Sequence, residues 1–204
     1  MPSPRSRAPR TDAARPGAVL ARRLVPGDAV RLVAATSFVV LVVAGEAIGA
    51  ALFLLILGGT VVPRAVGASA ALDVACGASL VLAGWASHLD WYTSVPWLDL
   101  AVHVVYTGLL AALAEVVLRH VSQRRERAEW HGAVRAVSRG STETVLLVGG
   151  LGAILAIFWE VGEWAGHTFL DEGIGVGYND TVSDLVAGLA GSLAAGVVVA
   201  RSNR

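Results

Sequence analysis

The sequence contains no lysine, a single cysteine and few charged residues of either sign. Of its 204 residues 16% are charged, compared with about 25% in a typical soluble domain. The lone Cys76 excludes a disulfide framework, and without a second cysteine or a nearby histidine it builds no zinc finger. The 16 acids balance 16 arginines, so the chain also lacks the basic surface of a nucleic-acid-binding protein.

Long apolar runs dominate what is present. The residues are 55% hydrophobic and the mean hydropathy is +0.63, which is typical of an integral membrane protein. We therefore predict an all-α polytopic membrane fold with about six transmembrane helices, surrounded by membrane lipid. The predicted spans are 29–45, 47–63, 68–88, 98–118, 142–165 and 181–200. They form a single domain over 29–200, between a disordered tail at 1–28 and a short tail at 201–204.

The first apolar run, from Ala29 to Pro63, admits two interpretations. As one helix it would be about 50 Å long at 1.5 Å per residue, whereas the hydrocarbon core is about 30 Å thick. Two short helices joined by a tight turn at Gly45 and Glu46 fit this thickness better. One long tilted helix is the alternative.

The arginines predict the orientation of the spans. They lie in 1–31, at Arg64, in 119–139 and at the C-terminus, and the loops between these positions contain none. Because cationic loops stay on the cytoplasmic side, six alternating spans place all four groups and both termini in the cytoplasm. The tail lacks the short apolar core of a cleavable signal peptide.

The acids are distributed in the opposite way. Nine of the 16 lie at or near the span ends that carry no arginine: Glu46, Asp90, Asp99, Glu160, Glu163, Asp171, Glu172, Asp180 and Asp184. Three of the five histidines, His88, His103 and His167, are there too. Asp73 and Glu115 fall in the other half of the membrane, and we expect these two to bind each other.

Two of the span starts carry a pair of polar residues four positions apart, Asp99 with His103 and Asp180 with Asp184. Residues at this spacing share one helical face. Asp99 and Asp180 could simply cap their helices, but the deeper residues lie a turn inside, where capping does not explain them. A ridge of small residues follows Asp184 and predicts close helix packing: Gly188, Gly191 and Ala195.

A third motif, FWEVGEWAGH, ends the fifth span. Glu160, Glu163, Trp164 and His167 recur at helical spacing and form one stripe. Two carboxylates on one turn repel each other unless a cation, a proton or a buried partner lies between them. The aromatic residues near these span ends, Trp159 and Trp164 included, are interpreted as an interfacial belt.

The three motifs enter the membrane from one side and can meet in an outward-facing polar pocket. Its predicted residues are Asp99, His103, Glu160, Glu163, His167, Asp180 and Asp184. Carboxylates and imidazoles suit a divalent cation, and the candidate metal ligands are His103, Glu160, Glu163 and Asp184. A tight ligand motif such as H-E-x-x-H is absent.

Three classes of function remain open for this pocket. It could bind a divalent cation or a polar or lipid substrate, with or without catalysis. It could serve a proton- or ion-coupled transporter. It could also be an internal polar clasp in a structural or partner-binding membrane protein.

Three segments carry a family resemblance: LDLAVHVVYTGLLAALAE, FWEVGEW and YNDTVSDLVAGLAGSLAA. Together they resemble the bacterial multi-span membrane proteins called YjdF-like, and more loosely the VanZ-like membrane proteins. The resemblance implies a six-span fold in the bacterial inner membrane and brings no established reaction.

Overall fold

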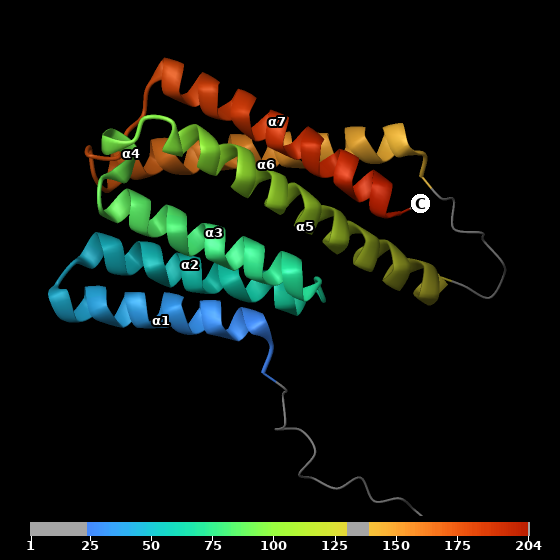
Figure 1. The fold of residues 1–204 in the computed structure, drawn as a ribbon, viewed down its shortest axis with the longest axis horizontal. Coiled ribbons are helices and arrows are strands. Elements are labelled where there is room, and N and C mark those ends of the chain that lie inside the picture. Colours follow the sequence, from blue (N-terminus) through green and yellow to red (C-terminus); the bar gives the residue numbers. More distant parts are fainter. Residues whose placement is uncertain (1–23, 130–138, 204) are drawn as a thin grey trace, which may run out of the picture.

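The computed structural model describes residues 24–129 and 139–203, which form seven α-helices and no strand (Figure 1). Six of the helices are long and apolar enough to cross a membrane, which confirms the predicted fold class. Most of the predicted tail 1–28 and the last residue, Arg204, lie outside the described residues. The helices are α1 (Pro26–Ala44), α2 (Ala47–Ala65), α3 (Ala70–His88), α4 (Trp91–Ser94), α5 (Leu98–Glu129), α6 (Ser141–Phe169) and α7 (Tyr178–Ser202).

The first apolar run folds as two helices, so the alternative of one long helix is wrong. Gly45 ends α1 with a φ of 79°, a left-handed conformation that glycine adopts at little cost. At the other end, α1 begins at Pro26, earlier than the predicted 29. Proline suits the first turn of a helix, and the Asp28 carboxylate accepts a 3.0 Å hydrogen bond from the Val25 N–H.

The long helices pack as two groups of three (Figure 1). One group is α1, α2 and α3, the other is α5, α6 and α7, and they meet mainly where α3 contacts α5. The start of α1 and the end of α7 lie at the same end of the bundle, called here the terminal end. The α1–α2 turn, α4 and the α6–α7 loop lie at the opposite end, called the far end.

Glycines bring α7 into close contact with α5 and α6. A Cβ on Gly191 would lie 1.9 Å from the backbone oxygen of Val104 in α5, and one on Gly188 would lie 3.3 Å from Ala156 in α6. The predicted ridge is thus confirmed at these two positions, while Gly196, packed on Val145, takes the third place in preference to Ala195. In a membrane such close approach stabilises helix pairs because van der Waals packing replaces the hydrophobic effect.

Ion pairs join α1, α2 and α3 at the terminal end. An Nη2–Oδ1 distance of 2.5 Å joins Arg31 to Asp73, and Arg31 also contacts Asp28 at 3.1 Å. Arg64 pairs with Asp28 as well. These four residues are called the arginine network.

Glu115 in α5 has its own arginine partners at the terminal end. It lies 2.5 Å from Arg119 and 3.4 Å from Arg139. The prediction that Asp73 and Glu115 bind each other is therefore wrong, because among the described residues each acid pairs with arginine. The Arg139 pair joins the residues just before α6 to α5, whereas the Arg119 pair lies within α5.

Candidate functional site

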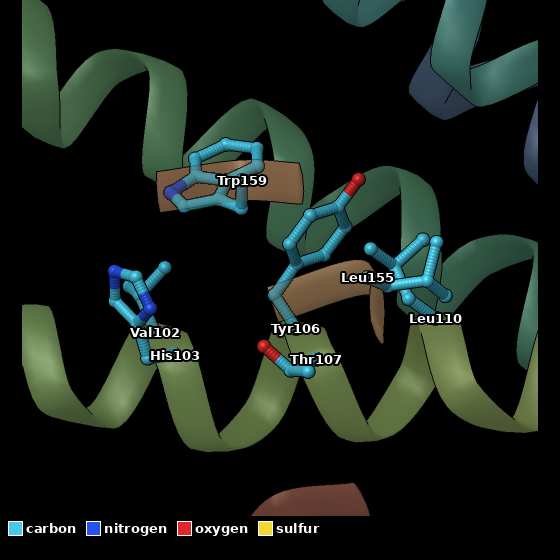
Figure 2. Close-up of a pocket in the computed structure, with 7 residues that line it drawn as sticks. All are labelled: Val102, His103, Tyr106, Thr107, Leu110, Leu155 and Trp159. Atoms are coloured by element: carbon cyan, nitrogen blue, oxygen red, sulfur yellow. The ribbon is translucent and has the colours of Figure 1, made fainter. Parts of the chain in front are cut away.

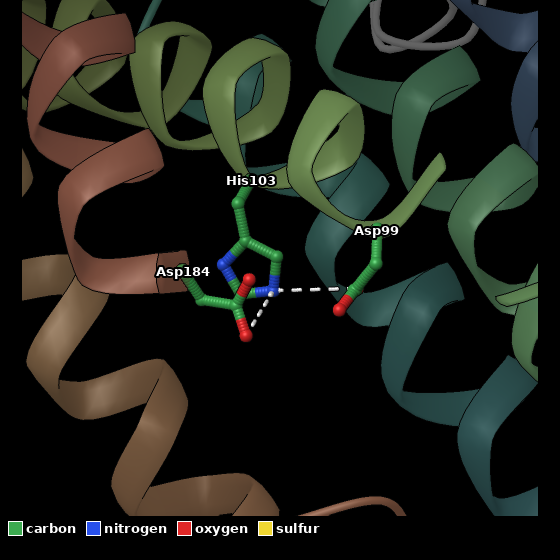
Figure 3. A group of neighbouring side chains, drawn as sticks. All are labelled: Asp99, His103 and Asp184. Carbon is green, nitrogen blue, oxygen red and sulfur yellow. Dashed lines mark ion pairs between the residues drawn. The ribbon is translucent and has the colours of Figure 1, made fainter. Parts of the chain in front are cut away.

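His103 is the centre of a polar cluster at the far end, buried to 6% exposure. It lies in the second turn of α5, four residues after Asp99, and its Nε2 is 3.6 Å from Asp99 Oδ1. The same Nε2 is 3.9 Å from Oδ2 of Asp184 in α7 (Figure 3). One ring nitrogen thus faces two carboxylates from two helices.

The other ring nitrogen of His103 faces α6. Its Nδ1 is 3.8 Å from Oε1 of Glu160. Glu163, one turn further along α6, accepts a 2.9 Å hydrogen bond from the indole N–H of Trp159. Together Asp99, His103, Glu160, Glu163 and Asp184 are called the carboxylate–histidine cluster.

Two carboxylate oxygens of this cluster are buried without a hydrogen-bond partner among the described residues, Oε1 of Glu160 and Oδ1 of Asp184. The side chains are 10% and 2% exposed. In the described part of the chain no arginine pairs with any of the four carboxylates. A buried carboxylate without a partner is costly, so these oxygens favour binding a proton or a cation.

The spacing of the cluster suits metal coordination in two places. Atoms of Asp99, His103 and Asp184 lie within 4.8 Å of one another, and so do atoms of His103, Glu160 and Glu163. All four predicted metal ligands therefore lie close together, but they divide into two groups that share His103. Carboxylate and imidazole ligands of this kind suit Mn²⁺, Mg²⁺ or Zn²⁺.

A small cavity adjoins His103 between α5 and α6 (Figure 2). Its water-accessible space is about 10 Å³, which is near the minimum for one water molecule. The lining residues are Val102, His103, Tyr106, Thr107, Leu110, Leu155 and Trp159. The cavity has room for water beside the cluster and none for a large organic ligand.

Two predicted pocket residues, His167 and Asp180, form no ion pair with His103 in the described part of the chain. The Nδ1 of His167 lies 2.7 Å from the backbone oxygen of Ile174, so this ring contacts the α6–α7 loop. Asp180 is exposed in the first turn of α7, where Gly177 is the N-cap, and its charge interacts with Asp99, His103, Glu160 and Asp184. Asp99 also falls in a first turn, and its carboxylate faces His103, so neither aspartate is the N-cap of its helix.

Trp159 is the residue that the sequence interpretation missed. The sequence predicts that it lies in an interfacial belt, yet its ring packs edge-on against Tyr106 at 5.6 Å and against His103 at 6.4 Å. The spacing of four residues between Trp159 and Glu163 was the available signal. Trp164, which belongs to both the predicted stripe and the predicted aromatic belt, is 52% exposed and contacts Phe169.

Tyr92 borders the cluster from α4, outside the membrane-spanning helices. Its hydroxyl donates a 3.3 Å hydrogen bond to the Ala83 carbonyl. Burial, followed by the charges of Asp99 and Glu163, raises the pKa of Tyr92. The phenol therefore stays protonated and adds no charge beside the carboxylates.

Comparison with known proteins gives a family assignment. A family model described as "Predicted membrane protein (DUF2238)" matches residues 28–204. No curated protein and no solved structure matches the chain. The match is consistent with the resemblance to YjdF-like proteins, while the looser likeness to VanZ-like proteins stays a prediction. The chain belongs to the DUF2238 family of predicted membrane proteins.

Proposed function

We propose that the carboxylate–histidine cluster is an outward-facing intramembrane site that binds a divalent cation. The observation that carries the proposal is a pair of buried carboxylate oxygens, on Glu160 and Asp184, that have no hydrogen-bond partner among residues 24–129 and 139–203. Four carboxylates surround one imidazole, and no arginine in the described part of the chain pairs with them. A divalent cation would offset this charge and satisfy the free oxygens together.

Packing beneath the cluster favours a binding or enzymatic site over a transport path. Going from the far end toward the terminal end, α5, α6 and α7 are in close contact at Gly188, Gly191 and Ser192. Ser192 is fully buried, and a Cβ on Gly152 would lie 1.9 Å from its hydroxyl oxygen. A transporter would need these contacts to open in each cycle.

We also propose that the far end faces the exterior of a bacterial inner membrane and that both termini are cytoplasmic. The proposal rests on the arginine distribution and on an even number of candidate spans. Reporter fusions at Arg64, Ser122 and Arg204 should report the cytoplasm, and fusions at Ser94 and Gly175 the exterior. A cytoplasmic signal from Ser94 would overturn the orientation.

Metal analysis of the purified full-length protein tests the cation proposal. We expect a stoichiometric divalent metal in the wild type and a lower content in Asp184→Asn, which keeps the side-chain shape and removes the charge. The matched control is Glu172→Gln, an acid of the α6–α7 loop outside the cluster, which should retain the wild-type content. Thermal unfolding of all three proteins checks that each is folded.

The other function classes give different outcomes in the same experiment. A polar clasp predicts no metal in the wild type and a lower thermal stability in Asp184→Asn. A proton-coupled transporter predicts no metal either, but a proton flux in vesicles that Asp184→Asn abolishes. Wild-type protein that holds no stoichiometric metal after incubation with Mn²⁺ or Zn²⁺ would refute the cation site.

A further inference from the structure

His103 lies between two groups of carboxylates, and one ion can use only one of its ring nitrogens. Taking the proposed cation site as given, we infer that the ion binds on the Nε2 side, held by His103, Asp99 and Asp184. Glu160 is then a positioning residue, whose carboxylate would accept a hydrogen bond from the Nδ1–H of the ring. This assignment differs from the four-ligand set predicted from the sequence, since Asp99 joins it while Glu160 and Glu163 leave it.

The position of Asp184 favours binding on the Nε2 side. Its side chain is 2% exposed, its Oδ2 is 3.9 Å from His103 Nε2, and its Oδ1 has no hydrogen-bond partner in the described chain. Asp99 approaches the same nitrogen to 3.6 Å (Figure 3). The close contact between Gly191 and the Val104 backbone keeps α7 and α5 at this separation, so the three donors are held by packed helices.

Glu160 and Glu163 have other tasks on the Nδ1 side. A histidine that binds metal through one nitrogen donates its other N–H to a carboxylate or carbonyl, which fixes its tautomer and orientation. Glu160 Oε1 lies 3.8 Å from Nδ1 and has no hydrogen-bond partner among the described residues, so it is the carboxylate oxygen placed to accept a hydrogen bond from that N–H. The Oε1 of Glu163 already accepts the Trp159 N–H at 2.9 Å.

Three protein ligands leave a coordination position for an exogenous ligand. Catalytic zinc sites with three protein donors hold water or a substrate in the fourth position, whereas structural zinc sites have four protein ligands. The class of ligand expected here is therefore water or an oxygen donor small enough to reach the buried ion. An open coordination position distinguishes a site that binds or transforms a ligand from a site that only holds helices together.

Binding of Mn²⁺ to full-length isosteric variants tests the assignment. On the Nε2 side, Asp184→Asn and Asp99→Asn should weaken affinity most. Glu160→Gln should weaken it by the roughly 10–100-fold typical of a lost outer partner. The loss of Mn²⁺ affinity in Glu163→Gln should be smaller than this roughly 10–100-fold range. The opposite order, with Glu160→Gln and Glu163→Gln most severe and Asp99→Asn mildest, would overturn the assignment and leave the cation site intact.

Cysteine substitution gives a spectroscopic signal that appears only when the substituted residue binds the metal directly, and not when its role is structural. Thiolate is a soft ligand that binds Co²⁺ directly, so Asp184→Cys loaded with Co²⁺ should show a thiolate-to-cobalt absorption band. Glu163→Cys should show none. The background is low because the native Cys76 is buried in α3, with its Sγ 4.0 Å from the Leu109 carbonyl oxygen. If Asp184→Cys does not fold, Asp99→Cys takes its place.

The outcomes distinguish the two proposals. Wild-type protein that binds neither Mn²⁺ nor Co²⁺ refutes the cation site itself. Wild-type protein that binds both, with the cobalt band in Glu163→Cys and not in Asp184→Cys or Asp99→Cys, refutes only the Nε2 assignment. A band in Asp184→Cys or Asp99→Cys alone supports it.

Discussion

The two ends of the helix bundle handle buried charge in different ways. At the terminal end Asp28 and Asp73 pair with Arg31 or Arg64, and Glu115 pairs with Arg119 and Arg139. At the far end four carboxylates share the single ring of His103, at distances of 3.6 to 3.9 Å for the three that pair with it. One end is matched in charge, and the other has an excess of acid.

This difference separates structural from functional charge. A buried acid that already has an arginine gains little from a ligand, and losing its partner is strongly destabilising. A buried acid without a partner raises the free energy of the fold until a cation or proton arrives. Both ends contain several acids. The far end is the candidate site because its buried acids, unlike those at the terminal end, have no arginine partner in the described part of the chain.

The largest effect is expected from breaking the arginine network. Arg31→Met removes the ion-pair partner of Asp73, whose side chain is 5% exposed. An uncompensated buried charge costs about 3–5 kcal/mol, so the free energy of unfolding should fall by about that amount in thermal or denaturant unfolding. Asp184→Asn at the far end should leave the metal-free protein at least as stable as the wild type.

A double variant sharpens this first prediction. Replacing both partners of a buried ion pair by apolar residues is often neutral or stabilising, so Arg31→Met with Asp73→Leu should recover most of the lost stability. If the double variant is no more stable than Arg31→Met alone, the deficit arises from packing, and the charge-matching account of the terminal end is wrong.

Metal should stabilise the protein through the far end alone. At a Mn²⁺ concentration 100 times the dissociation constant, binding raises the free energy of unfolding by about 2.7 kcal/mol. Asp184→Asn, with affinity reduced at least about 100-fold, should gain about 0.4 kcal/mol or less at the same concentration. Unfolding curves with Mn²⁺ and with a chelator measure both values. Equal gains in the two proteins would place the ion elsewhere.

Gly191→Ala should disturb the far end without touching the arginine network. The added Cβ would lie 1.9 Å from the Val104 backbone oxygen, and overpacking of this kind costs about 1–3 kcal/mol. Because α7 must move from α5, the distance between Asp184 and His103 should grow and Mn²⁺ affinity should fall. Gly150→Ala, where a Cβ meets nothing within 4 Å, is the matched control. A wild-type Mn²⁺ affinity in Gly191→Ala would argue against rigid positioning of the site.

The helices could be predicted from the sequence because length and apolar pattern largely decide them in a membrane. The turn at Gly45 was predictable for the same reason, since the 35-residue run from Ala29 to Pro63, apolar except for a few residues such as Arg31 and Glu46, exceeds one span. The pairing of side chains between different helices was not predictable in this way. Asp73 and Glu115 were expected to meet because both are isolated acids at one depth, but pairing depends on which helices are neighbours and how they are rotated.

In the candidate site, too, contacts within one helix could be predicted from the sequence and contacts between helices could not. Asp99 and His103 are on one helix, so their contact follows from a spacing of four residues. The division of four carboxylates into two groups around His103 depends on how α5, α6 and α7 cross, which no local pattern records. His167 has helical spacing to Glu163, yet its contact with Ile174 depends on the conformation of the following loop.

The smallest effect is expected from Trp159→Phe, which keeps an aromatic ring beside Tyr106 and removes the N–H that Glu163 accepts at 2.9 Å. Losing one hydrogen bond costs about 0.5–1.5 kcal/mol, so unfolding should show a small decrease in stability. Trp164→Phe is the matched control, because Trp164 is 52% exposed and its change should stay within about 0.5 kcal/mol.

Mn²⁺ binding to Trp159→Phe then separates the two sides of His103. If the ion lies on the Nε2 side, freeing Glu163 from Trp159 leaves the three ligands in place, and the affinity should change by less than the roughly 10–100-fold typical of a lost outer partner. If the ion lies on the Nδ1 side, the freed carboxylate becomes a better ligand and the affinity should rise clearly. A clear increase in affinity would therefore contradict the assignment of the ion to the Nε2 side of His103.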